Sequence, residues 1–132
     1  MFRWLKRKQD VAPLTGAPAQ PRLKTYSAQS GYVYQYAFRG QRPAAAKPTG
    51  MEYAFDVTYD RKTVHRFWVF IADVAVAEWT DRNARDLTNS ERYGVAKIAL
   101  RNAFDDREPS AMHDRIAPSA DEVIAILDEL GV

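Results

Sequence analysis

Side chains alternate between two faces along residues 31–39, 51–59 and 63–71 of this chain. In the first two stretches, every second residue is large and apolar. This face comprises Tyr32, Tyr34, Tyr36, Phe38, Met51, Tyr53, Phe55, Val57 and Tyr59. A period of two in residues that favour strands is typical of half-buried β-strands. Strands that follow one another along a chain are usually neighbours, so we expect a three-stranded antiparallel meander.

The tyrosines of the first stretch allow two interpretations. Alternating tyrosines can line a ligand pocket. More often they pack into a core with their hydroxyl groups at its rim, and we favour this interpretation. The side chains of residues 32–38 and 53–57 are then expected to lie side by side beneath helices.

The third stretch differs because both of its faces are apolar. Phe67, Val69 and Ile71 share one face, so Arg66, Trp68 and Phe70 share the other. If the first group faces the core, the second group forms a candidate interaction face.

Tryptophan and arginine are common anchors of protein interfaces, and aromatic rings beside an arginine can also stack nucleic-acid bases. On the neighbouring strand, Glu52 and Asp56 share this face and would repel phosphates. We therefore expect the face to be covered by a helix at residues 73–79, by a chain end or by a second copy of the chain, rather than by nucleic acid.

Two capping boxes predict where helices begin in the second half of the chain. Thr88 with Glu91 precedes a helical apolar stripe that ends at Phe104, and Ser119 with Glu122 precedes a second stripe that ends at Leu130. Asp73 is expected to cap a shorter helix through Trp79. The order predicts an α+β fold in which a three-stranded antiparallel meander is followed by two or three helices packed on one face (βββαα).

Composition divides the chain into three parts: a basic aromatic tail at residues 1–10, a Pro/Ala-rich tether at 11–30 that we expect to be disordered, and a single domain at 31–132. Residues 1–49 contain nine Lys/Arg and one acid, a net charge of +8, whereas residues 50–132 contain ten Lys/Arg and sixteen acids, a net charge of −6. This asymmetry suggests a basic interacting segment attached to an acidic domain.

The tail combines side chains that prefer a membrane interface, Phe2, Trp4 and Leu5, with the cations Arg3, Lys6, Arg7 and Lys8. Arg42 and Lys47 in the 40–50 loop add positive charge. Each cation near an anionic bilayer contributes about 1 kcal/mol, so four predict weak, salt-sensitive attachment. The same cations could bind nucleic-acid phosphates, or could serve only to keep the chain in solution.

Little in the sequence suggests catalysis. Cysteine is absent, which excludes disulfides and thiolate metal sites and fits a reducing cytosol. His65 and His113 have no spacing that links them, and no nucleotide-binding, nucleophile-elbow or metalloprotease motif occurs. We expect no metal, no cofactor and no catalytic residue.

Hydropathy also bears on where the chain acts. No apolar run approaches the roughly 18 residues of a membrane span. Prolines interrupt the stretch after the basic start, so we do not expect a secretory signal. These features favour a cytoplasmic protein that could contact a membrane from its surface.

The leading hypothesis is a non-enzymatic interaction or adaptor module that binds a protein partner or itself, with the tail bringing it to an anionic surface. The alternative is a nucleic-acid-binding protein that uses the tail, the 40–50 loop and the aromatic sheet face. A third possibility is an enzyme with a pocket between sheet and helices.

Overall fold

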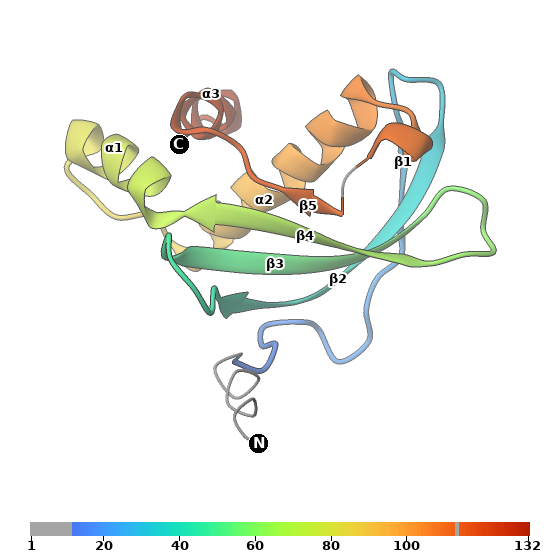
Figure 1. The fold of residues 1–132 in the computed structure, drawn as a ribbon. Helices are drawn as coiled ribbons and strands as arrows, with labels where there is room; N and C mark the ends of the chain where they lie inside the picture. The colour runs from blue at the N-terminus through green and yellow to red at the C-terminus, as the bar shows by residue number, and fades with distance from the viewer. Residues whose placement is uncertain (1–11, 113) are drawn as a thin grey trace.

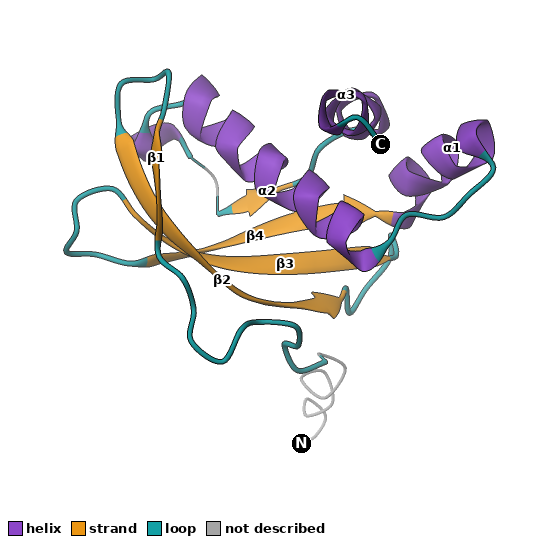
Figure 2. Cartoon of the chain, turned by 180° about the vertical axis from the view of Figure 1, so that it is seen from behind, coloured by secondary structure: helices purple, strands orange, loops and turns teal. Residues whose placement is uncertain are grey.

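The computed structural model describes residues 12–112 and 114–132. It contains a five-stranded sheet in the order β1-β2-β3-β4-β5, with helices α1, α2 and α3 on one of its faces (Figures 1 and 2). The strands are β1 (Lys24–Ser27), β2 (Val33–Pro43), β3 (Gly50–Thr58), β4 (His65–Ala72) and β5 (Arg115–Ile116). The helices are α1 (Asp73–Asn83), α2 (Asn89–Asp106) and α3 (Ala120–Leu130), with a 3-10 turn at Pro109–Ala111. The predicted α+β class and the antiparallel pairing of β2, β3 and β4 are confirmed.

The prediction of three strands is wrong, because the sheet has two more at its edges. β1 lies within the stretch predicted to be a disordered tether and pairs antiparallel with β2. Tyr26 holds it in place: the ring lies 6.2 Å from that of Phe104, and the hydroxyl donates a hydrogen bond of 2.7 Å to Asp105. A prediction from composition misses this strand, because a single aromatic side chain, Tyr26, anchors it to the helix layer.

β5 comes from the stretch between α2 and α3, where the sequence pattern predicted no strand. It pairs in parallel with β4 over two residues, and the Trp68 amide donates to the Asp114 carbonyl at 2.8 Å. Two residues are too few to produce a recognisable alternation.

Residues 12–23, which we name the strap, run along the outer edge of β2. Thr15 exchanges two backbone hydrogen bonds with Gln41, of 2.9 and 2.8 Å. A β-carbon on Gly40 would lie 3.0 Å from both the Thr15 carbonyl oxygen and the Leu14 β-carbon, and the φ of Gly40 is +123°. Glycine therefore permits both the backbone conformation and the close approach of the strap.

A β-bulge in β2 decides which residues share a face. Pairing with β3 shifts by one residue between Phe38 and Gly40. Because the side-chain period of a strand is two, this insertion turns Gln41 toward the helices and Arg42 toward the open face. Without the bulge, Arg42 would point at the helix layer.

The core lies between the sheet and the helices. Tyr34, Tyr36 and Tyr53 are buried, so core packing is confirmed for most of the tyrosine stripe, whereas Tyr32 is 39% exposed. The Tyr34 ring stacks on Phe104 of α2 with centroids 4.0 Å apart and planes within 5°. Sheet and helix layer are thus joined by aromatic packing.

Both predicted capping boxes are present at the starts of α2 and α3. Arg85 donates to the Glu91 carboxylate at 3.1 and 3.0 Å, and this contact, with the Thr88 amide at 2.8 Å, lowers the pKa of Glu91 to about 2. The first helix differs from its prediction. Ala72 is its N-cap, Asp73 is its first residue, and it extends to Asn83 rather than ending at Trp79.

Candidate functional site

No helix covers one face of the sheet (Figure 1), and by strand register this face carries four of the side chains singled out in the sequence, namely Arg42, Arg66, Trp68 and Phe70. By strand register, this open face includes Arg39, Arg42, Glu52, Asp56, Arg66, Trp68, Phe70 and Arg115. These side chains come from β2, β3, β4 and β5. They therefore form one continuous surface.

Each acid on the open face is shared by two arginines. Glu52 accepts from Arg42 at 3.0 Å and from Arg115 at 3.1 Å. Asp56 accepts from Arg66 at 2.8 Å and is 3.4 Å from Arg39. Four cations therefore surround two anions. The sequence-based expectation that Glu52 and Asp56 would make this face repel phosphates is not supported by this arrangement, because the arginines outnumber the acids.

The arginines also cover the aromatic rings. The Arg42 guanidinium lies 4.1 Å from the centre of the Trp68 ring, and that of Arg66 lies 5.8 Å from it. The Arg115 guanidinium lies 4.6 Å from the centre of the Phe70 ring. Trp68 is half-buried and Phe70 is only 4% exposed. Guanidinium groups of the sheet itself therefore lie over both rings, as cation–π pairs. Cover by a helix, a chain end or a second copy of the chain stays a prediction.

Gly50 is the first residue of β3, directly after the 44–49 loop, and its backbone packs closely against the Phe70 ring. A β-carbon at Gly50 would lie 2.5 Å from the Ile71 carbonyl oxygen and 2.6 Å from Phe70 Cε1. We expect Gly50→Ala to lower the free energy of unfolding by about 1–3 kcal/mol, because backbone must move to admit the methyl group. Urea unfolding measures this change.

Gly94→Ala is the matched control for that substitution. Gly94 lies inside α2, where the added β-carbon would meet only Leu130 Cδ1, at 3.3 Å. Alanine favours a helix over glycine by up to about 1 kcal/mol, so this variant should be as stable as the parent or more so. Equal losses in the two variants would contradict the role assigned to Gly50.

Charge is divided between the two layers of the fold. Residues 12–72, which form the strap and strands β1 to β4, contain eight Lys/Arg and three acids, a net charge of +5. Residues 73–132, which hold all three helices and the short strand β5, contain seven Lys/Arg and thirteen acids, a net charge of −6. The basic excess therefore extends beyond the tail, tether and loop into the sheet, and the acidic excess belongs to the helix layer.

The structure brings together four of the residues predicted from sequence, Arg42, Arg66, Trp68 and Phe70. Lys47 is exposed in the 44–49 loop. The tail residues Phe2, Arg3, Trp4, Leu5, Lys6, Arg7 and Lys8 lie outside the described residues. Sequence reasoning missed Arg39, which the alternation of β2 could have revealed, and Arg115, which joins the face only through the two-residue pairing of β5.

The features considered for catalysis remain dispersed. The His65 ring stacks on Tyr59 with centroids 5.6 Å apart, beside a shallow cavity that Asp114 also lines. His113 lies outside the described residues. Across residues 12–112 and 114–132, no group of three potential metal ligands is found. In the same residues, no helix is long and apolar enough to cross a bilayer.

A comparison of the chain with protein-family models, curated proteins and solved structures finds no match. The open face therefore has to be interpreted from its own geometry and charge.

Proposed function

We propose that this chain is a non-enzymatic interaction module that docks on an anionic membrane surface through the open face of its sheet, assisted by its basic tail. One observation carries the proposal: the open face presents four arginines around two acids. Three of these arginines belong to residues 12–72, whose net charge is +5, and the fourth, Arg115, comes from β5, whereas the helices on the opposite side lie in a segment with a net charge of −6. A molecule charged in this way will orient its sheet toward an anionic surface.

The composition of the tail favours a membrane over nucleic acid as the surface. Phe2, Trp4 and Leu5 prefer the bilayer interface, and the four tail cations supply about 1 kcal/mol each near anionic lipid. The covered rings of Trp68 and Phe70 argue against base stacking on the open face, on which sequence-tolerant binding of single strands relies. Anionic lipids of this kind line the cytoplasmic leaflet, so we place the chain in the cytoplasm at the membrane periphery.

The acidic helix layer would then face away from the membrane. This orientation leaves it free to meet a protein partner or a second copy of the chain, as an adaptor requires. Residues 73–132 carry no comparable excess of cations that would compete for the lipid surface.

Co-sedimentation with vesicles tests the proposal. The full chain should bind phosphatidylserine/phosphatidylcholine vesicles and not pure phosphatidylcholine vesicles. Binding should fall steeply between about 50 and 500 mM salt, because the attraction is electrostatic. Substitution of the four tail cations by glutamine (Arg3→Gln, Lys6→Gln, Arg7→Gln and Lys8→Gln) should weaken binding without abolishing it, since the sheet contributes separately. Equal binding to both vesicle types, or tighter binding to a single-stranded oligonucleotide than to anionic vesicles, would refute the membrane assignment.

A further inference from the structure

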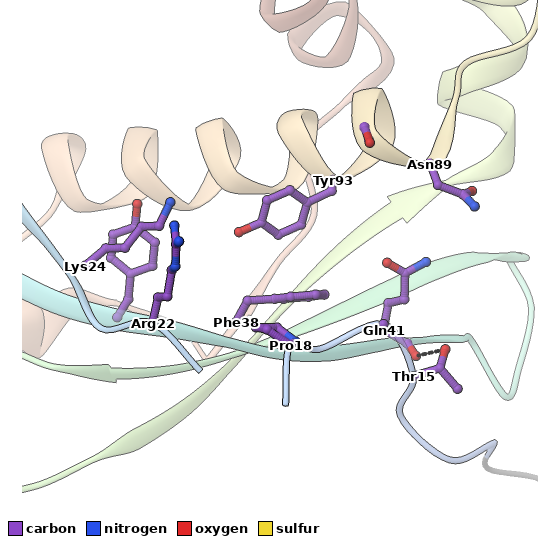
Figure 3. Close-up of a pocket in the computed structure, with 11 residues that line it drawn as sticks. Thr15, Pro18, Arg22, Lys24, Phe38, Gln41, Asn89 and Tyr93 are labelled. Carbon is purple, nitrogen blue, oxygen red and sulfur yellow. Dashed lines mark hydrogen bonds between the residues drawn. The ribbon is translucent and has the colours of Figure 1, made fainter. Parts of the chain in front are cut away.

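A cavity of about 520 Å³ lies between the strap, β2 and the start of α2, on the helix side of the sheet. It is distinct from the open face. Figure 3 shows side chains from all three segments pointing into it. Cavities that bind small molecules usually measure about 300–1,000 Å³, so this one can hold a ligand of the size of a mononucleotide.

The middle of the cavity is aromatic. Phe38 of β2 and Tyr93 of α2 lie with ring centroids 4.7 Å apart (Figure 3), and Pro18 of the strap also lines the cavity. The two rings are inclined by 59°, so they do not stack on each other face to face. A planar ligand could lie against them and gain both apolar burial and aromatic contact.

One end of the cavity is cationic. Arg22 and Lys24 line it and appear together in Figure 3, and none of the lining residues is an acid. Lys97 and Arg101 continue the same side of α2, one and two turns beyond Tyr93. Burial, reinforced by the charges of Lys24 and Arg101, lowers the pKa of Lys97.

These cations have few partners within the fold. Arg101 donates to the Tyr36 hydroxyl at 3.2 and 3.0 Å, and the nearby Asp105 carboxylate already accepts from Tyr26 and from the Gln29 amide. Among the described residues, Arg22, Lys24 and Lys97 form no salt bridge. An anion in the cavity would relieve the repulsion among them.

The other end carries polar groups that can donate or accept hydrogen bonds. Gln41, which the bulge turns toward the helices, lies there with Asn89 and Thr15 (Figure 3). Asn89 and Ser90 are the first two residues of α2. The cavity is thus arranged as a cationic end, an aromatic middle and an amide end.

We infer that this cavity binds a small organic anion in which an aromatic ring carries a carboxylate or phosphate group. The ring would lie against Phe38 and Tyr93, the anionic group would meet Arg22 and Lys24, and polar atoms of the ring would meet Gln41 and Asn89. The basic tail of this chain is a poor occupant because its charge has the same sign as that of the cavity. The inference is independent of the proposed membrane docking, which uses the opposite face.

Titration of the isotopically labelled full chain, followed by NMR, tests the inference. The probes are adenosine 5′-monophosphate and indole-3-acetate, with adenosine, indole and inorganic phosphate as matched compounds that lack either the charge or the ring. At least one aromatic anion should bind with a Kd below about 1 mM and shift the amides of Gly16, Gln41 and Tyr93. It should bind at least about tenfold more tightly than its matched compounds.

Three variants examine the role of charge. Arg22→Gln with Lys24→Gln should weaken binding about tenfold, whereas Arg61→Gln with Lys62→Gln, at the exposed β3–β4 turn, should leave it unchanged. Asn89→Asp should also weaken binding. It should fold well, because an acid favours the start of a helix. The inference is wrong if neither anion binds below about 1 mM, if a matched compound binds as tightly, or if Asn89→Asp binds like the parent.

Discussion

Replacement of Phe104 by alanine is expected to lower the free energy of unfolding by about 3–5 kcal/mol, the usual cost of removing a buried aromatic side chain. Phe104 is fully buried in α2 and stacks on Tyr34 with centroids 4.0 Å apart. Its ring also lies 6.2 Å from that of Tyr26 and 6.1 Å from that of Tyr36. One side chain thus joins α2 to both β1 and β2, and alanine would leave a cavity at that junction.

Urea unfolding of the full chain, with ellipticity as the signal, measures this effect. Domains of this size are stable by about 5–15 kcal/mol, so the variant should lose a large share of its stability. Val74→Ala is a suitable control, because Val74 is 72% exposed and its truncation should change stability by less than about 0.5 kcal/mol. A loss below about 1 kcal/mol at Phe104 would show that the aromatic packing contributes little.

Neutralising two arginines on the open face is expected to weaken binding to phosphatidylserine vesicles about 30-fold. The figure follows from about 1 kcal/mol for each cation near the surface, with tenfold for every 1.4 kcal/mol. Arg39→Gln with Arg66→Gln is the suitable pair, because their side chains are 42% and 40% exposed and neither lies as close to an aromatic ring as Arg42 does. Asp56 loses both partners in this variant, but its side chain is 30% exposed, so water can solvate the carboxylate. The sheet should therefore stay folded, and thermal unfolding checks this.

The main elements of the fold could be predicted because their signals are local. Alternation along β2, β3 and β4 and the two capping boxes each depend on residues within a few positions of one another. The place of Phe104 on the apolar stripe of a helix could also be predicted from its neighbours in the sequence. Its partner Tyr34 lies 70 positions away, and no local pattern indicates which tyrosine it meets.

The edge strands could not be predicted, because they depend on contacts made only in the folded chain. β1 is a four-residue strand in a proline-containing stretch, and Tyr26 anchors it through Phe104 and Asp105. β5 is two residues long and depends on the backbone of Trp68. Recruitment of short segments to an existing sheet leaves little trace in composition.

The candidate site could be predicted only in part, because some of its residues also come together only in the folded chain. Strict alternation places Arg66, Trp68 and Phe70 together on β4. Arg42 joins them only because the bulge before Gly40 shifts β2 by one residue, and Arg115 joins them only through β5. A charge count divided at residue 50 also hid the division between strands and helices. The boundary that matters is at residue 73, where strands β1 to β4 give way to a segment that holds all three helices and the short strand β5.

The most direct test of the proposed function compares charge removal from the two layers. Arg39→Gln with Arg66→Gln removes two charges from the open face, and Arg82→Gln with Arg107→Gln removes two from exposed positions in the helix half. Both variants change the net charge from +2 to 0. If the sheet docks on the membrane, only the open-face variant should lose binding to phosphatidylserine vesicles. Equal loss in both variants would mean that net charge alone governs binding, and would contradict docking through the open face.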